Sequence, residues 1–382
     1  MSDANLVKAC NGQTLQNSAD YFGATNLEGE TKKRIFEAIQ HQLVETYGDS
    51  YVFENFTYDI NKVRLLEGDR LIDIDVYVDM TLTRSASENE YIQGMLEMAN
   101  KLEGNEKLFV KNEIKPLIMD IEEAYYNPRN VRVLYTVKIG DPRMEIFESF
   151  ELYSRVDFLG EEESLLNRVH NIKSKNIKDK ENAFENGYQT VVDIIANTPE
   201  TNISEGVPAA YALAVASVQY DRIKARDWAR DNRDKAPEYN SADKTGSDCA
   251  NFVSRAINQG GIPQDISGNW AHWSNGSTLA ALKYINWFRT GFNNNGGVVP
   301  YLVNKNYFYH ESSLSKAFAG SIIYNTKRSH VGLVTSGDGS NIYYADHSDV
   351  KKSGRETLLQ KTSDPSFEQF TFYLPYSSIL KP

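Results

Sequence analysis

The chain has 382 residues, of which 41% are hydrophobic and 24% charged, so it is long enough for two domains and has the composition of an ordinary folded protein. Its net charge is −11, with 22 basic and 37 acidic side chains in residues 1–220 and 19 and 15 in the remainder. This asymmetry supports a boundary near residue 206, and the lack of a strongly basic stripe argues against nucleic acid as the main ligand.

The first 167 residues predict an α+β domain with an antiparallel sheet. Residues 31–47 have apolar side chains at helical spacing, residues 71–82 alternate as a strand does, and a helical pair is expected over 87–124. Two further strands are expected within 131–152. Three aspartates in the second strand are expected on a solvent-facing side, which outweighs the alternative of a metal site. No catalytic motif is visible here, so we expect an accessory or binding role.

Residues 168–206 predict a structured connector rather than a free linker. Its first part is rich in Lys, Asn and Glu, residues 197–202 carry turn chemistry, and residues 184–195 between them form a short amphipathic pattern. A second domain is then expected over 207–382, beginning with a long helix over 209–233.

The segment 246–261 predicts a short helix with a thiol on its first turn. Ser247 or Asp248 is suited to cap its start, and the glycine pair at 260–261 to end it. Cys249 therefore lies where backbone N–H groups are unpaired and the helix dipole favours a thiolate, which is a nucleophile. The alternative, a small buried hydrophobe, is the commoner role of a lone helix cysteine.

The segment 329–347 predicts a β-hairpin with a histidine at its mouth. Asp-Gly at 338–339 lies between two β-prone runs and is a strong signal for a two-residue turn, which would place His330 opposite His347. A slip of one residue would place Asp346 there instead. We expect His347 to orient His330, although the carboxylate of Asp346 is the better chemical partner for an imidazole.

These residues resemble the putative amidase domain family of the papain-like superfamily, which is related more distantly to the NlpC/P60 and CHAP cell-wall hydrolases. The resemblance covers about the last 165 residues. It rests on Tyr220, Arg222 and Ala225; on Asp248, Cys249, Asn251, Phe252, Val253 and Ser254; on Gly260 and Gly261; and on Ser329, His330, Ala345, His347 and Ser348. Two positions depart from the family pattern: Ser321 stands where Asp is usual and Arg255 where Gln is usual.

The resemblance implies a papain-like (NlpC/P60-type) α+β fold and a cysteine amidase or peptidase acting on peptidoglycan or a peptide. Tyr239 lies near the position where related enzymes place an oxyanion-binding tyrosine, with a packing role as the alternative. Asp248 adjoins the nucleophile, and Trp270 and Trp273 are candidates for substrate contact. No cluster has metal-ligand spacing, so neither metal nor other cofactor is expected.

Other functions remain open at this point. The same fold without turnover would be a module that binds cell-wall fragments, and capture of the thioester by an amine would make a transferase. No run of about 18 apolar residues occurs, so no membrane span is expected. The two cysteines, Cys10 and Cys249, provide no disulfide framework. A location in the cell envelope or outside the cell is expected for a wall hydrolase, a cytoplasmic one is not excluded, and the oligomeric state is unknown.

Overall fold

The computed structural model describes residues 29–66, 69–139, 150–154, 182–197, 218–235, 248–272, 283–291, 296–326, 329–347, 356–360 and 370–381. The chain divides into two compact units: residues 1–84 with 124–173, and residues 85–123 with 174–382. Both combine helices with antiparallel strands, which confirms the α+β class. The division into 1–167, 168–206 and 207–382 stays a prediction, but the contacts group residues 85–123 with the later part of the chain.

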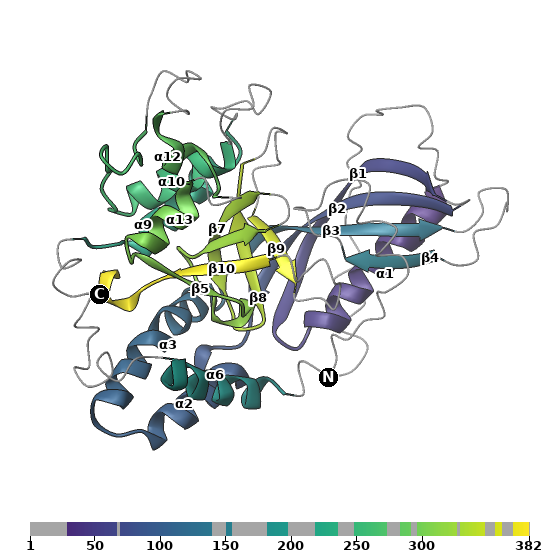
Figure 1. The fold of residues 1–382 in the computed structure, drawn as a ribbon. Helices are drawn as coiled ribbons and strands as arrows, with labels where there is room; N and C mark the ends of the chain where they lie inside the picture. The colour runs from purple at the N-terminus through teal and green to yellow at the C-terminus, as the bar shows by residue number, and fades with distance from the viewer. Residues whose placement is uncertain are drawn as a thin grey trace. The chain divides into compact units, whose positions relative to one another are not determined.

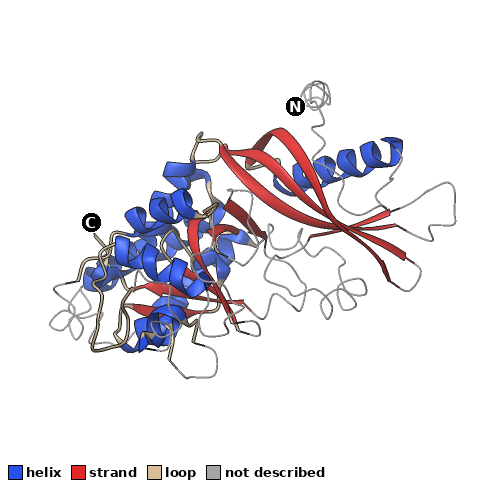
Figure 2. Cartoon of the chain, turned by 90° about the horizontal axis from the view of Figure 1, so that it is seen from above, coloured by secondary structure: helices blue, strands red, loops and turns tan. Residues whose placement is uncertain are grey.

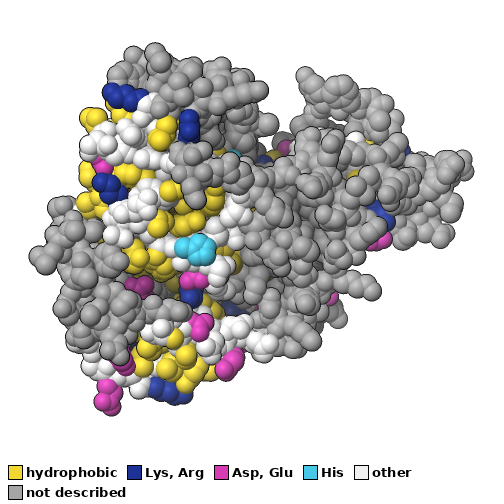
Figure 3. All heavy atoms as spheres, in the orientation of Figure 1, with side chains coloured by type: hydrophobic (Ala, Val, Ile, Leu, Met, Phe, Trp, Pro, Cys, Tyr) yellow, Lys and Arg dark blue, Asp and Glu magenta, His cyan; other side chains and the backbone are white. Residues whose placement is uncertain are grey.

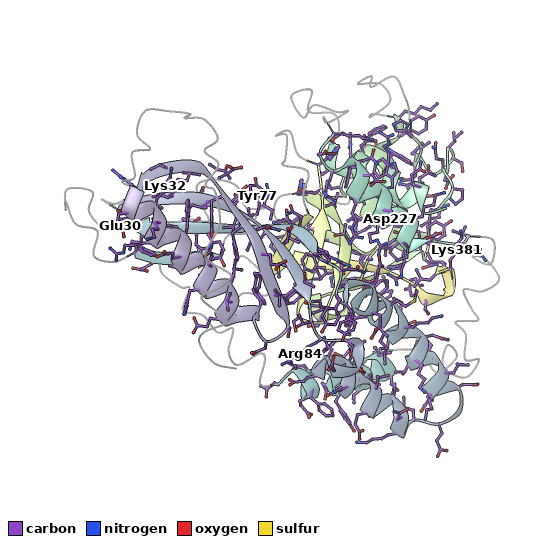
Figure 4. All side chains as sticks on the ribbon, turned by 180° about the vertical axis from the view of Figure 1, so that it is seen from behind. Glu30, Lys32, Tyr77, Arg84, Asp227 and Lys381 are labelled. Carbon is purple, nitrogen blue, oxygen red and sulfur yellow. The ribbon has the colours of Figure 1, made fainter. Side chains whose placement is uncertain are left out.

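Among its described residues, the first unit contains a helix and a four-stranded antiparallel sheet (Figures 1 and 2). The helix is α1 (Gly29–Tyr47), with Glu30 and Lys32 at its start in Figure 4. The strands follow the order β1-β2-β3-β4, with bounds β1 (Tyr51–Leu66), β2 (Asp69–Leu82), β3 (Arg129–Ile139) and β4 (Phe150–Ser154). The helix expected over 31–47 and the strand expected over 71–82 are both confirmed.

The helix α1 packs on the sheet through the apolar stripe that the sequence predicts. Ile35, Ile39 and Leu43 recur every four residues and are all buried, because this spacing places them on one face of a helix. Phe36 stacks on Tyr58 of β1 with 3.9 Å between the ring centroids. The contact fixes the helix against the first strand.

The aspartates of β2 correct one expectation. Asp73 and Asp75 are buried rather than solvent-facing. Asp73 accepts a hydrogen bond of 2.8 Å from the Thr136 hydroxyl, and Asp75 lies 3.4 Å from the Arg132 guanidinium on the neighbouring β3. These cross-strand partners satisfy the buried carboxylates, as buried polar groups require.

The second unit contains a sheet of strand order β9-β8-β7-β6-β10-β5, in which the paired neighbours are antiparallel. Its bounds are β5 (Phe308–Glu311), β6 (Ile322–Asn325), β7 (His330–Gly337), β8 (Asn341–Ala345), β9 (Glu356–Gln360) and β10 (Phe370–Pro375). Four helices lie together beside these strands in Figure 1: α9 (Arg222–Asn232), α10 (Asp248–Gln259), α12 (Ile285–Phe288) and α13 (Val298–Asn304). The surface described in Figure 3 mixes apolar and charged side chains.

The second unit also includes α2 (Glu90–Lys101), α3 (Gly104–Ala124) and α6 (Ala183–Asn197). A Cβ atom at Gly94 of α2 would lie 1.9 Å from the Phe184 carbonyl oxygen, and one at Gly187 of α6 equally close to that of Tyr91. The two helices therefore cross at a point where only glycine fits. The helices predicted over 87–124 and 184–195 are confirmed.

Asp120 joins α3 to the strands and to α9. Its side chain is buried, pairs with Arg222 at 2.5 Å, and accepts backbone N–H groups from Ala319 at 2.6 Å and Gly337 at 3.4 Å. A carboxylate that holds three separate segments in a buried position explains why residues 85–123 belong to this unit.

The helix expected over 209–233 begins later, at Arg222. Residues 209–217 lie outside the described residues, whereas Tyr220 is extended and forms an isolated bridge with Leu380. Asp221 caps the helix, because its side chain accepts the backbone N–H of Lys224 at 2.9 Å. The described part of this segment is therefore extended at Tyr220 and helical from Arg222.

Candidate active site

The helix α10 carries Cys249 as its second residue, as the sequence predicts. Ser247 lies outside the described residues, and Asp248 is already helical rather than the residue before the helix. At the other end Gly261 has φ +109°, and a Cβ atom there would lie 2.6 Å from the Gln219 carbonyl oxygen. Glycine is thus required for the chain to leave the helix.

The Cys249 side chain is only 2% exposed. Its position in the first turn of α10 places the sulfur at the positive end of the helix dipole. The thiol is buried because the apolar face of α10 and the strand β7 pack around it.

His330, the first residue of β7, contacts Cys249 and Asp346 at once. Its Nε2 lies 2.7 Å from Asp346 Oδ2, and its side chain is also hydrogen-bonded to Cys249. Since Nε2 is taken by the carboxylate, we infer that Nδ1 serves the thiol. Asp346 is buried, whereas the His330 side chain is 20% exposed. The three side chains thus contact one another in the order of a nucleophile, a base and an orienting carboxylate.

Opposing influences act on the His330 imidazole. Burial lowers its pKa, but the negative charge of Cys249 and the hydrogen bonds to Asp346 and Cys249 outweigh this and raise the pKa to about 10. The proton therefore stays on the ring at neutral pH when the thiolate is present. A thiolate beside an imidazolium is the reactive form of a cysteine nucleophile.

The hairpin between β7 and β8 does not have the register expected from its sequence. The tip is Gly339-Ser340, because Gly337 pairs with Ile342 and the Asp338 carboxylate accepts the backbone N–H groups of Ser340 and Asn341. The position of this tip shifts the pairing of β7 with β8 by two residues from the expected register, in which Gly337 would pair with Ser340.

A bulge at Thr335 moves the pairing back by one residue, so Val334 pairs with Tyr344 and Leu333 with Ala345. The net slip of one residue turns Asp346 to the face that carries His330. The predicted facing of His347 and His330 is therefore wrong. Gly332 leaves room for this arrangement, since a Cβ atom there would lie 3.3 Å from that of Asp346.

His347 instead lies on the opposite face and binds the start of α10. Its Nδ1 is 2.6 Å from Asp248 Oδ2, and its Nε2 is 2.8 Å from the Asn232 carbonyl oxygen. The ring stacks on Phe252 with 4.4 Å between centroids. A carbonyl oxygen can only accept, so Nε2 donates the hydrogen bond to Asn232. The other carboxylate oxygen of Asp248 accepts a hydrogen bond from the Asn251 side-chain amide at 3.4 Å.

The aromatic candidates fall into two groups. Trp270 is completely buried and packs against Trp287 and Tyr301, so it is part of the core and not a substrate contact. Trp273 and Tyr239 lie outside the described residues.

Tyr324 and Asn251 were not singled out as site residues from the sequence. The Tyr324 hydroxyl of β6 is hydrogen-bonded to Thr290 and Ser329, and the charge of Cys249 acts on it. Asn251 accepts the Trp287 indole N–H at 2.9 Å. The Asp-Cys-x-Asn spacing pointed to Asn251, whereas nothing local marks one tyrosine among 23.

Among the described residues, no group of three or more His, Cys, Asp or Glu side chains is arranged to hold a metal ion. No helix in the same part of the chain is both long and apolar enough to span a membrane.

Comparison with known proteins gives one match. Residues 219–369 match the family profile described as "Putative amidase domain". No curated protein and no solved structure matched the chain. The matched range contains the cysteine helix, the strand of His330 and the carboxylate beside it. Residues 219–369 are therefore similar to the putative amidase domain family, and this match supports a hydrolase.

Proposed function

We propose that the domain is a cysteine amidase or peptidase in which Cys249 is the nucleophile, His330 the acid and base, and Asp346 the residue that orients His330. The observation that carries the proposal is the placement of His330 between Cys249 and Asp346. A cysteine at a helix start facing a histidine at a strand start is also the papain-like arrangement, which agrees with the resemblance noted from the sequence.

The reaction proceeds in two halves. The Cys249 thiolate attacks the amide carbonyl carbon, and the backbone N–H of Cys249 in the first turn of α10 stabilises the oxyanion. His330 donates its proton to the leaving nitrogen, the C–N bond breaks and a thioester remains. Water then attacks the thioester while His330 accepts its proton, the C–S bond breaks, and the acid product leaves.

The Asp248–His347 pair holds this geometry without taking part in the chemistry. Asp248 immediately precedes Cys249, and His347 immediately follows Asp346. Their buried contact of 2.6 Å therefore ties the helix that bears the nucleophile to the strand end that bears the orienting carboxylate. We assign both as positioning residues.

As substrate we propose an amide bond in the peptide part of bacterial peptidoglycan, with the protein in the cell envelope or outside the cell. The support is the resemblance to cell-wall hydrolases. The test is mass spectrometry of products from purified peptidoglycan treated with the protein. We expect a new carboxyl and amine pair with the wild type and none with Cys249→Ala. Intact peptidoglycan peptides alongside cleavage of a simple amide would contradict the substrate, and no cleavage of any amide would contradict the reaction.

The burial of Cys249 favours a second candidate, a module that binds wall fragments without turnover. Alkylation by a small thiol reagent near pH 6 separates the two. Labelling of Cys249 much faster than that of free cysteine supports the amidase, because a thiolate is already present, whereas a rate like that of free cysteine or lower supports the binding module.

A further inference from the structure

A pocket of about 160 Å³ lies beside α10, on the helix face next to the one that carries Cys249. Its walls come from the end of α9, from one face of α10 and from the residue after Asp346. Cys249 and His330 are not among its described lining residues. The pocket is therefore distinct from the candidate nucleophile and base. Two of its lining residues are nevertheless neighbours in the chain of the nucleophile and of the orienting carboxylate, because Asp248 precedes Cys249 and His347 follows Asp346.

The charge of the pocket favours an anion. Arg255 and Lys235 supply two cations, and the only acid among the described lining residues, Asp248, is already paired with His347 at 2.6 Å. Burial lowers the pKa of Arg255. A bound oxyanion would accept hydrogen bonds from ionised donors, which are stronger than hydrogen bonds between neutral groups.

Neighbouring groups fix the orientation of both cations. The Arg255 guanidinium lies over the Trp228 ring, 5.1 Å from its centroid, and the Lys235 ammonium donates to Asn232 Oδ1 at 2.7 Å. Pre-oriented donors lose less conformational entropy when a ligand binds. The rings of Trp228 and Phe252 add apolar surface for a carbon stem.

We propose that this space, named here the Arg255 pocket, binds a small organic carboxylate. The ligand is either a carboxylate of the amide substrate or a separate effector. The first source rests on the proposed function, whereas the binding itself does not. Because Asp248 and His347 form part of the wall, the ligand touches residues adjacent to both the nucleophile and the orienting carboxylate.

The test uses N-acetylglycine as probe and N-acetylglycinamide, its uncharged twin, as the matched ligand. Both are titrated into the full-length Cys249→Ala protein, and the Trp228 indole N–H is followed by nuclear magnetic resonance. We expect a saturable shift with the carboxylate and at least about tenfold weaker binding of the amide, because a hydrogen bond to a charged group is worth roughly 1.5–3 kcal/mol. Added salt should weaken binding of the carboxylate.

The matched variants are Arg255→Gln, Lys235→Gln and Lys224→Gln. Arg255→Gln should weaken binding of N-acetylglycine at least about tenfold, and Lys235→Gln by roughly twofold to fivefold, because Lys235 is exposed. Lys224 lies exposed on α9 and does not line the pocket, so Lys224→Gln makes the same change in net charge and should leave the affinity unchanged. Lys235→Gln serves if Arg255→Gln does not fold.

Three results would overturn the proposal: no saturable shift, equal affinity for the two probes, or an equal loss in Lys224→Gln. The wild type then identifies the source. Competitive inhibition of amide cleavage by N-acetylglycine indicates the carboxylate of a substrate, and a change in turnover without competition indicates an effector. If no amide is cleaved at all, the proposed reaction fails while the binding result still stands.

Discussion

Two histidine–aspartate pairs flank the start of α10, and they differ in what each ring can still do. His330 uses one nitrogen for Asp346 and the other side of its ring for Cys249, and its side chain remains 20% exposed. His347 has both nitrogens engaged, with Asp248 and with a backbone carbonyl. A base must exchange its proton with a substrate, so only the first pair is suited to catalysis. The second pair, in which both ring nitrogens of His347 are engaged, is suited to holding the start of α10 in position.

The largest effect should come from removing the group that the first pair serves. Cys249→Ala should lower turnover by on the order of 10⁴-fold or more, because no other group forms the thioester. Turnover on a responsive amide substrate and a melting curve for folding are the measurements. Cys10→Ala, the other cysteine of the sequence, is the control and should act like the wild type. Wild-type turnover in Cys249→Ala would remove the basis of the mechanism.

Breaking the first pair should come next. Asp346→Ala should lower turnover by roughly 10²-fold to 10⁴-fold, because the imidazole loses its orientation and the support of its charged form. His347→Ala should lower turnover by only about tenfold, since it acts through position alone. Both variants are assayed at saturating substrate. A crippled His347→Ala beside an active Asp346→Ala would reverse the roles of the two pairs.

Breaking the second pair should instead appear in stability. Asp248→Asn or His347→Ala should lower the free energy of unfolding by about 3–5 kcal/mol, because a buried partner is left alone. Denaturant unfolding measures this. Asp227, labelled in Figure 4, has a half-exposed side chain that pairs with Arg226, so Asp227→Asn is the control and should cost less than about 1 kcal/mol. Equal losses in the two cases would show that the buried pair holds nothing in place.

A smaller effect should appear in the pH profile. The pKa of His330 is raised to about 10, so the imidazolium that protonates the leaving amine is present at neutral pH and is lost only as the pH rises through 10. The alkaline limb of kcat/KM should therefore lie near pH 10 in the wild type. In Asp346→Ala it should move to lower pH, because the carboxylate no longer favours the charged ring. If the alkaline limb of kcat/KM lies at the same pH in Asp346→Ala, Asp346 does not stabilise the charged form of His330.

The cysteine helix and the histidine strand could be predicted because each depends on local signals. The start and end of α10, its apolar face and the β-prone runs around the Asp-Gly pair are all properties of short segments. The choice between Asp346 and His347 depended instead on the register, which an extra residue at Thr335 changes. Arg230 donates to the Thr335 carbonyl at 3.2 Å, a contact from a distant helix that no local pattern reveals.

The burial of the β2 aspartates and the domain membership of residues 85–123 could not be predicted from the sequence, for the same reason. The alternation in β2 predicted one solvent-facing side, but Asp73 and Asp75 are covered and paired across strands. The helices of residues 85–123 read as part of the first domain, whereas Asp120 joins them to Arg222 and to two backbone N–H groups of the amidase part. Contacts between segments about 60 to 220 residues apart decide both outcomes.

The proton of His330 gives the most direct test of the central claim that Cys249, His330 and Asp346 act as one group. Histidine-labelled protein is titrated by nuclear magnetic resonance in the wild type and in Asp346→Ala, Cys249→Ala and His347→Ala. We predict a wild-type pKa near 10, lower values in Asp346→Ala and Cys249→Ala, and a value close to that of the wild type in His347→Ala. A wild-type pKa near the ordinary 6.5 that neither Asp346→Ala nor Cys249→Ala changes would contradict the account.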